Sequence, residues 1–267
     1  MNIYKTENVM GKLEGKIALI TGSDSGIGQA SAIELAKEGA DVVITYHSDK
    51  EGAEETLKAV QEAGRKGIII KIDVSDEENV ERMFDKALEE FGDLHILINN
   101  AAINGQGIRV EDLSTEKWDK AIKTNLYGYF FCVRRFINIR KQKGGKGKII
   151  NVSSVHEDIP APGTADYCST KGAIRMLTRT LALELAEYQI NVNNIAPGMI
   201  LTPFNQEAQE DKEVRKDKAS NIPLKRAGTP AEIGKLAVFL ASSDSDYVTG
   251  STYVMDGGLM QNVGQGA

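Results

Sequence analysis

Cysteine, tryptophan and histidine are scarce in this chain of 267 residues, which has two cysteines, one tryptophan and three histidines. Cys132 and Cys168 are too few and too far apart for a disulfide framework or a zinc site, so we expect no bound metal. Two cysteines in a chain of this length are typical of a reducing compartment. We therefore expect a cytoplasmic protein.

Long apolar runs and an excess of positive charge are also missing. The chain contains no run of about 18 apolar residues, the length that could cross a membrane. Residues 1–15 have the pattern of neither a signal peptide nor an anchor. The net charge of −6 argues against binding to nucleic-acid phosphates or to a membrane surface. We expect partners of neither kind. The 41% hydrophobic and 26% charged residues are typical of a globular protein with a substantial core.

Short apolar runs alternate with helical patterns along the whole chain, which is typical of βαβ units. We predict an α/β fold, a Rossmann-type doubly wound parallel sheet of about seven strands with helices on both faces. The strands are expected at residues 16–21, 41–46, 67–72, 95–99, 148–152, 191–195 and 252–255. The helices are expected at residues 27–38, 51–62, 77–91, 115–139, 167–187 and 231–241, with Ser75 and Ser114 among their caps.

No change in composition divides the chain, so we predict a single domain over residues 1–267. Residues 198–229 depart from the alternation because they are long, polar and interrupted by Pro203 and Pro223. Long loops in compact domains commonly close over a binding site. We predict that this segment is a lid over substrate and cofactor.

A glycine-rich turn follows the first expected strand. Gly22, Gly26 and Gly28 allow the chain to turn tightly and to bring backbone amides and a helix N-terminus close to a pyrophosphate. Such a motif is weak alone, but its place between a strand and a helix favours dinucleotide binding.

Tyr167 and Lys171 are one helical turn apart, so they share a helix face and can form an acid/base pair. A tyrosine with a pKa of about 10 is a poor base at neutral pH unless positive charge lowers that value. We predict that Lys171 supplies this charge. The pair indicates an enzyme that moves a proton and a hydride.

Several motifs in order resemble the short-chain dehydrogenase/reductase family over almost the whole chain. Thr21–Gly28 matches its TGxxxGIG turn, Asp73-Val74 matches its adenine contact, and 99–102 matches its NNAG motif except that Ala102 replaces glycine. The resemblance implies an NAD(P)-dependent oxidoreductase acting on CH–OH groups.

The resemblance also implies the catalytic residues. Ser154, thirteen residues before Tyr167, would hydrogen-bond the substrate oxygen while Tyr167 exchanges its proton. Lys171 would support the tyrosine and bind the nicotinamide ribose. Asn125 would hold a water that relays protons.

The cofactor contacts that the resemblance implies share positions at strand ends and in the lid segment. They are Gly22, Ser25, Gly26, Ile27, Gly28, Tyr46, His47, Asp73, Val74, Asn100, Ala101, Tyr167, Lys171, Pro197, Gly198 and Thr202. After the second strand, where an acid would exclude a 2′-phosphate, the chain has no acid until Asp49. We therefore expect NAD or NADP, with dual use and a slight preference for NADP.

The regions around Ser154 and the carboxyl terminus most resemble bacterial glucose 1-dehydrogenases, which implies a small hydroxylated substrate. Ser154, His156 and Asn104 are the expected substrate contacts, although Asn104 replaces a glutamate of those enzymes. A 3-oxoacyl-thioester (acyl-carrier-protein) reductase is the alternative, with Arg134, Arg135 and Arg140, near Lys141, Lys143 and Lys146, as a docking surface for the carrier. A cofactor-sensing protein without turnover is a further alternative. The family also implies a homotetramer.

Overall fold

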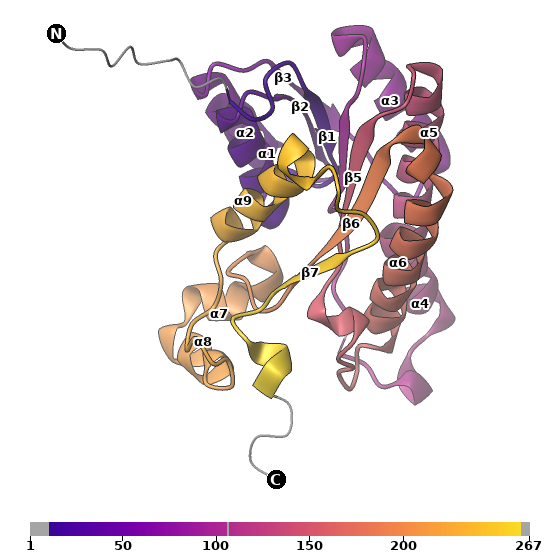
Figure 1. The fold of residues 1–267 in the computed structure, drawn as a ribbon. Helices are drawn as coiled ribbons and strands as arrows, with labels where there is room; N and C mark the ends of the chain where they lie inside the picture. The colour runs from indigo at the N-terminus through magenta and orange to yellow at the C-terminus, as the bar shows by residue number, and fades with distance from the viewer. Residues whose placement is uncertain (1–10, 106, 263–267) are drawn as a thin grey trace, which may run out of the picture.

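The computed structural model describes residues 11–105 and 107–262, and its strands form one parallel sheet (Figure 1). The sheet order is β3-β2-β1-β4-β5-β6-β7. The strands are β1 (Ile17–Ile20), β2 (Asp41–Tyr46), β3 (Gly67–Lys71), β4 (Ile96–Asn99), β5 (Gly147–Val152), β6 (Ile190–Pro197) and β7 (Thr252–Met255). Each of the seven predicted strands is present, so the predicted fold class is confirmed.

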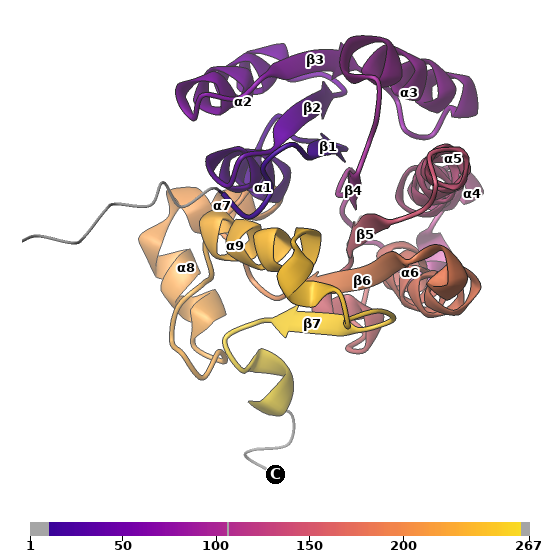
Figure 2. The same ribbon diagram turned by 45° about the horizontal axis from the view of Figure 1, so that its top comes forward.

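Helices cover both faces of the sheet (Figure 2). One face carries α1 (Gly26–Lys37), α2 (Lys50–Glu62) and α9 (Pro230–Ala241). The other face carries α3 (Glu77–Phe91), α4 (Thr115–Ile122), α5 (Gly128–Gln142) and α6 (Ala165–Glu184). Strands covered on both faces are buried, which explains why their sequences are nearly continuous apolar runs.

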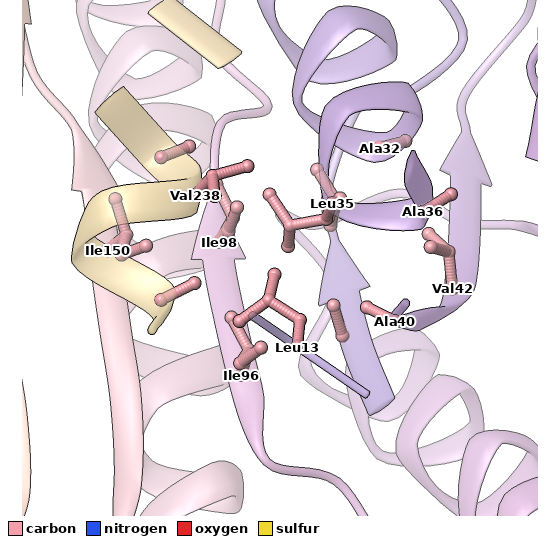
Figure 3. Close-up of a cluster of buried hydrophobic side chains, with 14 of the residues drawn as sticks. Leu13, Ala32, Leu35, Ala36, Ala40, Val42, Ile96, Ile98, Ile150 and Val238 are labelled. Atoms are coloured by element: carbon pink, nitrogen blue, oxygen red, sulfur yellow. The ribbon is translucent and has the colours of Figure 1, made fainter. Parts of the chain in front are cut away.

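The core between α1, α9 and the sheet is made of aliphatic side chains (Figure 3). Leu35 of α1 and Val238 of α9 face Ile98 of β4 in this cluster. Gly234 allows α9 to lie close to α1, because a Cβ atom there would be 2.9 Å from the Ala30 carbonyl oxygen. This contact fixes α1, and with it the glycine turn that precedes α1.

The strand order reverses between β1 and β4: successive strands are added on one side of β1 up to β3, and on its other side from β4 onward. β1 pairs with β2 on one side and with β4 on the other, and all of these pairs are parallel. The carboxyl ends of the strands therefore meet at one edge, where loops leave in opposite directions. Ligands of open α/β sheets bind at such a point.

Two local predictions need correction. The expected helix 115–139 is divided into α4 and α5 by a π-helical turn, Lys123–Tyr127. Asp76 rather than Ser75 caps α3, since its side chain accepts the amide of Asn79, whereas Ser75 bonds to Asp73. Ser114 caps α4 as predicted.

The expected lid, residues 198–229, contains the short helices α7 (Gln206–Glu210) and α8 (Lys212–Ala219). It is therefore less irregular than its sequence suggested. The prediction of one domain includes residues 1–10 and 263–267, which lie outside the described residues, and it stays a prediction.

Candidate active site

A cavity of about 1360 Å³ lies at the carboxyl ends of the strands. The predicted residues that line it are Gly22, Ser25, Gly26, Ile27, Tyr46, His47, Asp73, Val74, Asn100, Ala101, Asn104, Ser154, His156, Tyr167, Lys171, Pro197, Gly198 and Thr202. Gly28 and Asn125 are outside the lining. The structure thus brings residues from both halves of the chain to one cavity.

The glycine turn is held by hydrogen bonds to neighbouring strands and loops, and the Ser23 hydroxyl of the turn accepts the Thr45 amide at 2.9 Å. The Asn100 amide donates to the carbonyls of Thr21 and Gly22, at 3.0 and 2.8 Å, and the Thr45 hydroxyl accepts the Gly22 amide. Gly22 and Gly26 have positive φ angles of 62° and 54°, which favour glycine. Gly28 lies outside the cavity because it packs beneath the turn, where a Cβ would be 2.1 Å from the Gly22 oxygen.

Asp73 follows β3 and lines the cavity. One carboxylate oxygen accepts both the amide and the hydroxyl of Ser75, at 2.9 and 2.7 Å. The other oxygen is 3.9 Å from Nε2 of His47, whose side chain is largely exposed. These contacts hold Asp73 at the cavity wall beside the loop that follows β2.

Asn125 is fully buried in the π-helical turn. Its side-chain oxygen accepts the Ile103 amide at 2.8 Å, and its nitrogen donates to the Ile103 carbonyl at 2.9 Å and to Thr170 at 3.4 Å. The asparagine side chain therefore holds the loop that follows β4 against α6. The predicted relay water would have to be held by other atoms of this turn.

Ser154 and Tyr167 meet at the end of β5. Both side chains are buried. Burial raises the pKa of Tyr167 to about 12, and the neighbouring Ser154 opposes the rise only in part. We predicted a lowered pKa, so that expectation is wrong for the protein by itself. A phenol with this pKa keeps its proton at neutral pH and is suited to donating it.

Lys171 is buried on the same face of α6, one turn beyond Tyr167. Its ammonium nitrogen donates to the Val152 carbonyl at 2.8 Å and lies 5.4 Å from the centre of the Tyr167 ring. Burial lowers the pKa of Lys171 to about 7, against the pull of Glu157 toward a higher value. Desolvation is thus the largest cause of the pKa shift at both members of the acid/base pair.

Sequence reasoning missed Tyr129. This buried side chain donates its hydroxyl to the same Val152 carbonyl at 2.9 Å, and its ring centre is 5.3 Å from Nζ of Lys171. Its position four residues after Asn125 places both on one helix face. That spacing was the signal available in the sequence.

The expected substrate contacts lie beside Tyr167. His156 stacks edge-on against Tyr167, with 6.1 Å between the ring centres, and its Nδ1 is 2.8 Å from the Ile159 carbonyl. Nε2 of His156 is the ring nitrogen that remains for a ligand. Asn104 lines the cavity, and its side-chain oxygen accepts the Gly105 amide.

The residues of this cavity fit a dinucleotide coenzyme. A Cβ at Gly22 would be 3.1 Å from the Ala101 backbone, and one at Gly26 would be 3.2 Å from Thr202, so glycine leaves the backbone open to a close ligand. The first turn of α1 contains no acidic residue that would repel phosphate. When bound, a nicotinamide coenzyme supplies or accepts a hydride at this site.

A family model described as enoyl-(acyl carrier protein) reductase matches residues 22–260. The chain belongs to the short-chain dehydrogenase/reductase family. It is 41% identical to glucose 1-dehydrogenase 2 of Bacillus subtilis over 92% of this chain and 95% of that protein. It is 43% identical to 3beta-hydroxysteroid dehydrogenase 1 of Eggerthella lenta over 92% of this chain and 94% of that one.

A solved structure from Agrobacterium tumefaciens with bound NADP has a TM-score of 0.85 and is 33% identical, covering 96% of this chain and all of that one. Together with the family match, these relatives identify the chain as an NAD(P)-dependent oxidoreductase that acts on alcohol groups. The helices within the described residues are too short or too polar to span a membrane. Across the same residues, no group of three histidine, cysteine or acidic side chains is arranged to hold a metal.

Proposed function

We propose that the protein transfers hydride between a nicotinamide coenzyme and a secondary alcohol or carbonyl, with Ser154, Tyr167 and Lys171 as catalytic residues. The observation that carries the proposal is their arrangement: three buried polar side chains, one from the turn after β5 and two from α6, line the cavity that begins at the glycine turn. Buried polar groups with strongly shifted pKa values in a cleft are typical of active sites.

In this proposal Tyr167 donates its proton to the carbonyl oxygen during reduction, and Ser154 hydrogen-bonds the same oxygen as charge develops. Lys171 supports the resulting phenolate when its own amine is protonated. Because burial lowers the pKa of Lys171 to about 7, reduction should slow as the pH rises through that value. Asn125 takes part indirectly, by holding the loop after β4.

NADP is the coenzyme that we propose as preferred, with NAD also used. His47 and Ser48 follow β2, where an acid would otherwise repel the 2′-phosphate. Lys50 is paired with Glu54 at 2.9 Å, so it is not a dedicated phosphate clamp. The related structure with bound NADP supports this preference. The lack of a dedicated arginine explains why we propose a preference rather than exclusivity.

Glucose is the first substrate to test, because of the resemblance to glucose 1-dehydrogenase 2 and because His156 offers Nε2 near Tyr167. An apolar secondary alcohol is the second candidate. Its support is the set of apolar side chains in the cavity lining: Val155, Ile159, Met199, Phe204 and Leu259. A sugar needs several hydrogen-bond partners, whereas such a wall favours a hydrophobic ring. The relative named as a hydroxysteroid dehydrogenase is consistent with the second candidate.

Reduction of a 3-oxoacyl thioester has weaker support from the surface that would receive an acyl carrier. Arg134, Arg135 and Arg140 each form an ion pair with an acidic side chain of α3 or of the loop before β4. Arg140 is also buried and donates to backbone carbonyls. These arginines therefore stabilise the fold, and little of their charge is available to a carrier.

We also propose that the protein is a cytoplasmic homotetramer that binds neither nucleic acid nor membrane. Exposed apolar side chains on α5 and α6, including Phe130, Met176 and Leu183, and on the last strand, Val254, would be covered by other copies. The two free cysteines are consistent with a reducing compartment. Sedimentation equilibrium tests the assembly: a mass close to the 29.0 kDa of one chain would contradict it.

The test of the function is a panel of initial rates at 340 nm. Glucose, other sugars, polyols and cyclic secondary alcohols are compared with NAD and with NADP, and ketones and 3-oxoacyl thioesters with the reduced coenzymes. Turnover of any of these substrates supports the reaction class, and the ratios identify substrate and coenzyme. Absence of turnover with every substrate and both coenzymes would contradict the proposal and favour a cofactor-sensing protein.

A further inference from the structure

A chain of buried side chains runs beneath the carboxyl ends of β4, β5 and β6. Asn99, Asn151 and Asn194 occupy paired positions on these strands, and Thr178 of α6 lies against them. The Asn99 amide donates to Asn151 at 2.9 Å, and the Asn151 amide donates to Thr178 at 2.8 Å. Thr178 donates to Asn194 at 2.6 Å, and the Asn194 amide donates to Glu157 at 3.3 Å. We call these five residues the buried polar chain.

Each hydrogen bond of the buried polar chain points in the same direction. The Thr178 hydroxyl accepts from Asn151 and donates to Asn194, and the series ends at a carboxylate, which only accepts when it is ionised. Hydrogen bonds aligned in this way polarise one another in a low dielectric. The direction of the chain therefore fits a negative charge on Glu157.

Glu157 also lies beside a cation. Its side chain is 1% exposed, and Nε of Arg175 lies 3.6 Å from its second oxygen. Arg175 also forms an ion pair with Asp158, the next residue. A buried carboxylate needs such partners, because an unpaired charge in the interior is very costly.

The position of Glu157 connects it with the reacting groups. It ends the short turn Val155–Glu157, which is capped by Ser154 and contains His156, and its amide donates to the Ser154 carbonyl at 3.0 Å. Arg175 lies one helical turn after Lys171 on α6. Glu157 thus joins the turn that carries Ser154 to the helix that carries Tyr167 and Lys171.

We propose that Glu157 is a positioning residue, which fixes the Ser154 turn on α6 and places a buried carboxylate beside the segment of α6 that carries Lys171. The inference rests on the proposed roles of Ser154 and Lys171. Of the groups around Lys171, Tyr129 of α5 and Tyr167 of α6 are neutral phenols with raised pKa values, and Val152 of β5 offers a carbonyl. Glu157 is the carboxylate that raises the pKa of Lys171 against burial.

Glu157→Gln tests the charge while keeping an acceptor oxygen for Asn194. The titration of Lys171 is followed by NMR in protein labelled with ¹³C at lysine Cε, with the Lys171 signal assigned from its loss in Lys171→Arg. The midpoint should move to lower pH by roughly one unit. The alkaline fall in the rate of carbonyl reduction should move in the same direction. Asp158→Asn is the control, because it removes a neighbouring, partly exposed charge outside the buried polar chain and should leave the midpoint in place.

Arg175→Met should move the Lys171 midpoint the other way, to higher pH, because it removes a cation that screens Glu157. Arg175 is 27% exposed, and Glu157 keeps the Asn194 amide as a partner in this variant, so Arg175→Met gives a second, independent measurement of the Lys171 midpoint. Glu157→Asp, which keeps the charge, should restore most of the wild-type midpoint. An unchanged midpoint in Glu157→Gln, or a downward shift in Arg175→Met, would overturn the inference. The NMR titration needs no substrate, so its outcome is separate from a failure of the proposed function.

Discussion

The turn after β1 and the turn after β5 lie at the same edge of one sheet, yet they are built in opposite ways. The first turn exposes backbone, and its glycines leave no side chain between the chain and a ligand. At the second turn, polar side chains pack into the interior: Ser154 of the turn itself, and Tyr167 and Lys171 of α6. At this one edge, the first turn offers exposed backbone for binding. The second turn offers buried polar side chains for the reaction.

The two turns differ in what they cost the folded state. Exposing glycine backbone costs little, whereas burying ionisable side chains is unfavourable. Glycine at a positive φ is a low-energy solution for close approach to a phosphate. Burial favours the neutral form of both groups: it lowers the pKa of the Lys171 amine to about 7 and raises the pKa of the Tyr167 phenol to about 12. The second turn is thus the part of the site in which stability and chemistry compete.

Removal of the Tyr167 hydroxyl should have the largest effect. Tyr167→Phe keeps the ring contacts but deletes the proton donor, so the turnover number should fall by about 10²–10⁴-fold. Initial rates on the best substrate of the panel measure this fall. Tyr253→Phe, on the last strand and outside the cavity lining, is the matched control. Turnover near the wild-type value in Tyr167→Phe would remove Tyr167 from the mechanism.

Lys171→Met should separate stability from activity at the second turn. The pKa of Lys171 is lowered from 10.5 to about 7, so the unfolded chain binds more protons between these values and the stability of the folded wild type rises with pH across that window. At pH 7 or below, burial of the Lys171 amine lowers the free energy of unfolding by its full amount. The variant should therefore be more stable at pH 7 by about 1–4 kcal/mol, and nearly inactive.

Urea unfolding at pH 7 and pH 9.5, at one protein concentration, measures this effect. The advantage of Lys171→Met should shrink at the higher pH. Lys58→Met, which changes an exposed lysine of α2, should show little difference at either pH. A variant less stable than wild type at pH 7 would mean that the Lys171 hydrogen bond outweighs its desolvation.

A methyl group should have opposite effects in the two regions. In Gly28→Ala the new Cβ would lie 2.1 Å from a backbone oxygen, so stability should fall by about 1–3 kcal/mol. In Gly172→Ala, inside α6, the nearest atom is 4.0 Å away, and stability should rise by about 0.5–1 kcal/mol. Thermal unfolding of both variants in parallel gives the comparison. Equal changes would show that the tight packing beneath the glycine turn does not matter.

The last predicted effect concerns the coenzyme. His47→Asp places a carboxylate after β2, so the ratio of kcat/KM for NADPH over NADH should fall by about tenfold, which corresponds to roughly 1.4 kcal/mol. His47→Asn changes the side chain without adding charge and should leave the ratio within about twofold of the wild-type value. A fall of the same size in both variants would show that shape rather than charge at His47 sets the preference.

Sequence patterns predicted the parts of the molecule that depend on local order. Alternating apolar runs located the seven strands, and because parallel strands end at one edge, motifs such as Gly22 and Tyr167 could be expected to meet there. The π-helical turn at Asn125 could not be predicted, since it depends on how Ile103 and α6 pack against it. The helices α7 and α8 were hidden in a polar segment without a strong period.

The electrostatics of the second turn also escaped sequence reasoning. The spacing of Tyr167 and Lys171 predicts an interacting pair, but the direction of the tyrosine pKa depends on how deeply α6 and β5 bury it. The buried polar chain joins Asn99 to Glu157 across residues that are far apart in sequence. Such contacts come from strand register, which a single sequence does not specify.

The most direct test of the contrast between the two turns is the dissociation constant of NADPH, measured by its fluorescence in wild type, Gly28→Ala and Tyr167→Phe. The account predicts that Gly28→Ala weakens binding by about tenfold or more, since the crowded turn can no longer approach the pyrophosphate. Tyr167→Phe should bind within about threefold of wild type. The opposite pattern, or an equal loss in both variants, would contradict the division between a binding turn after β1 and a reacting turn after β5.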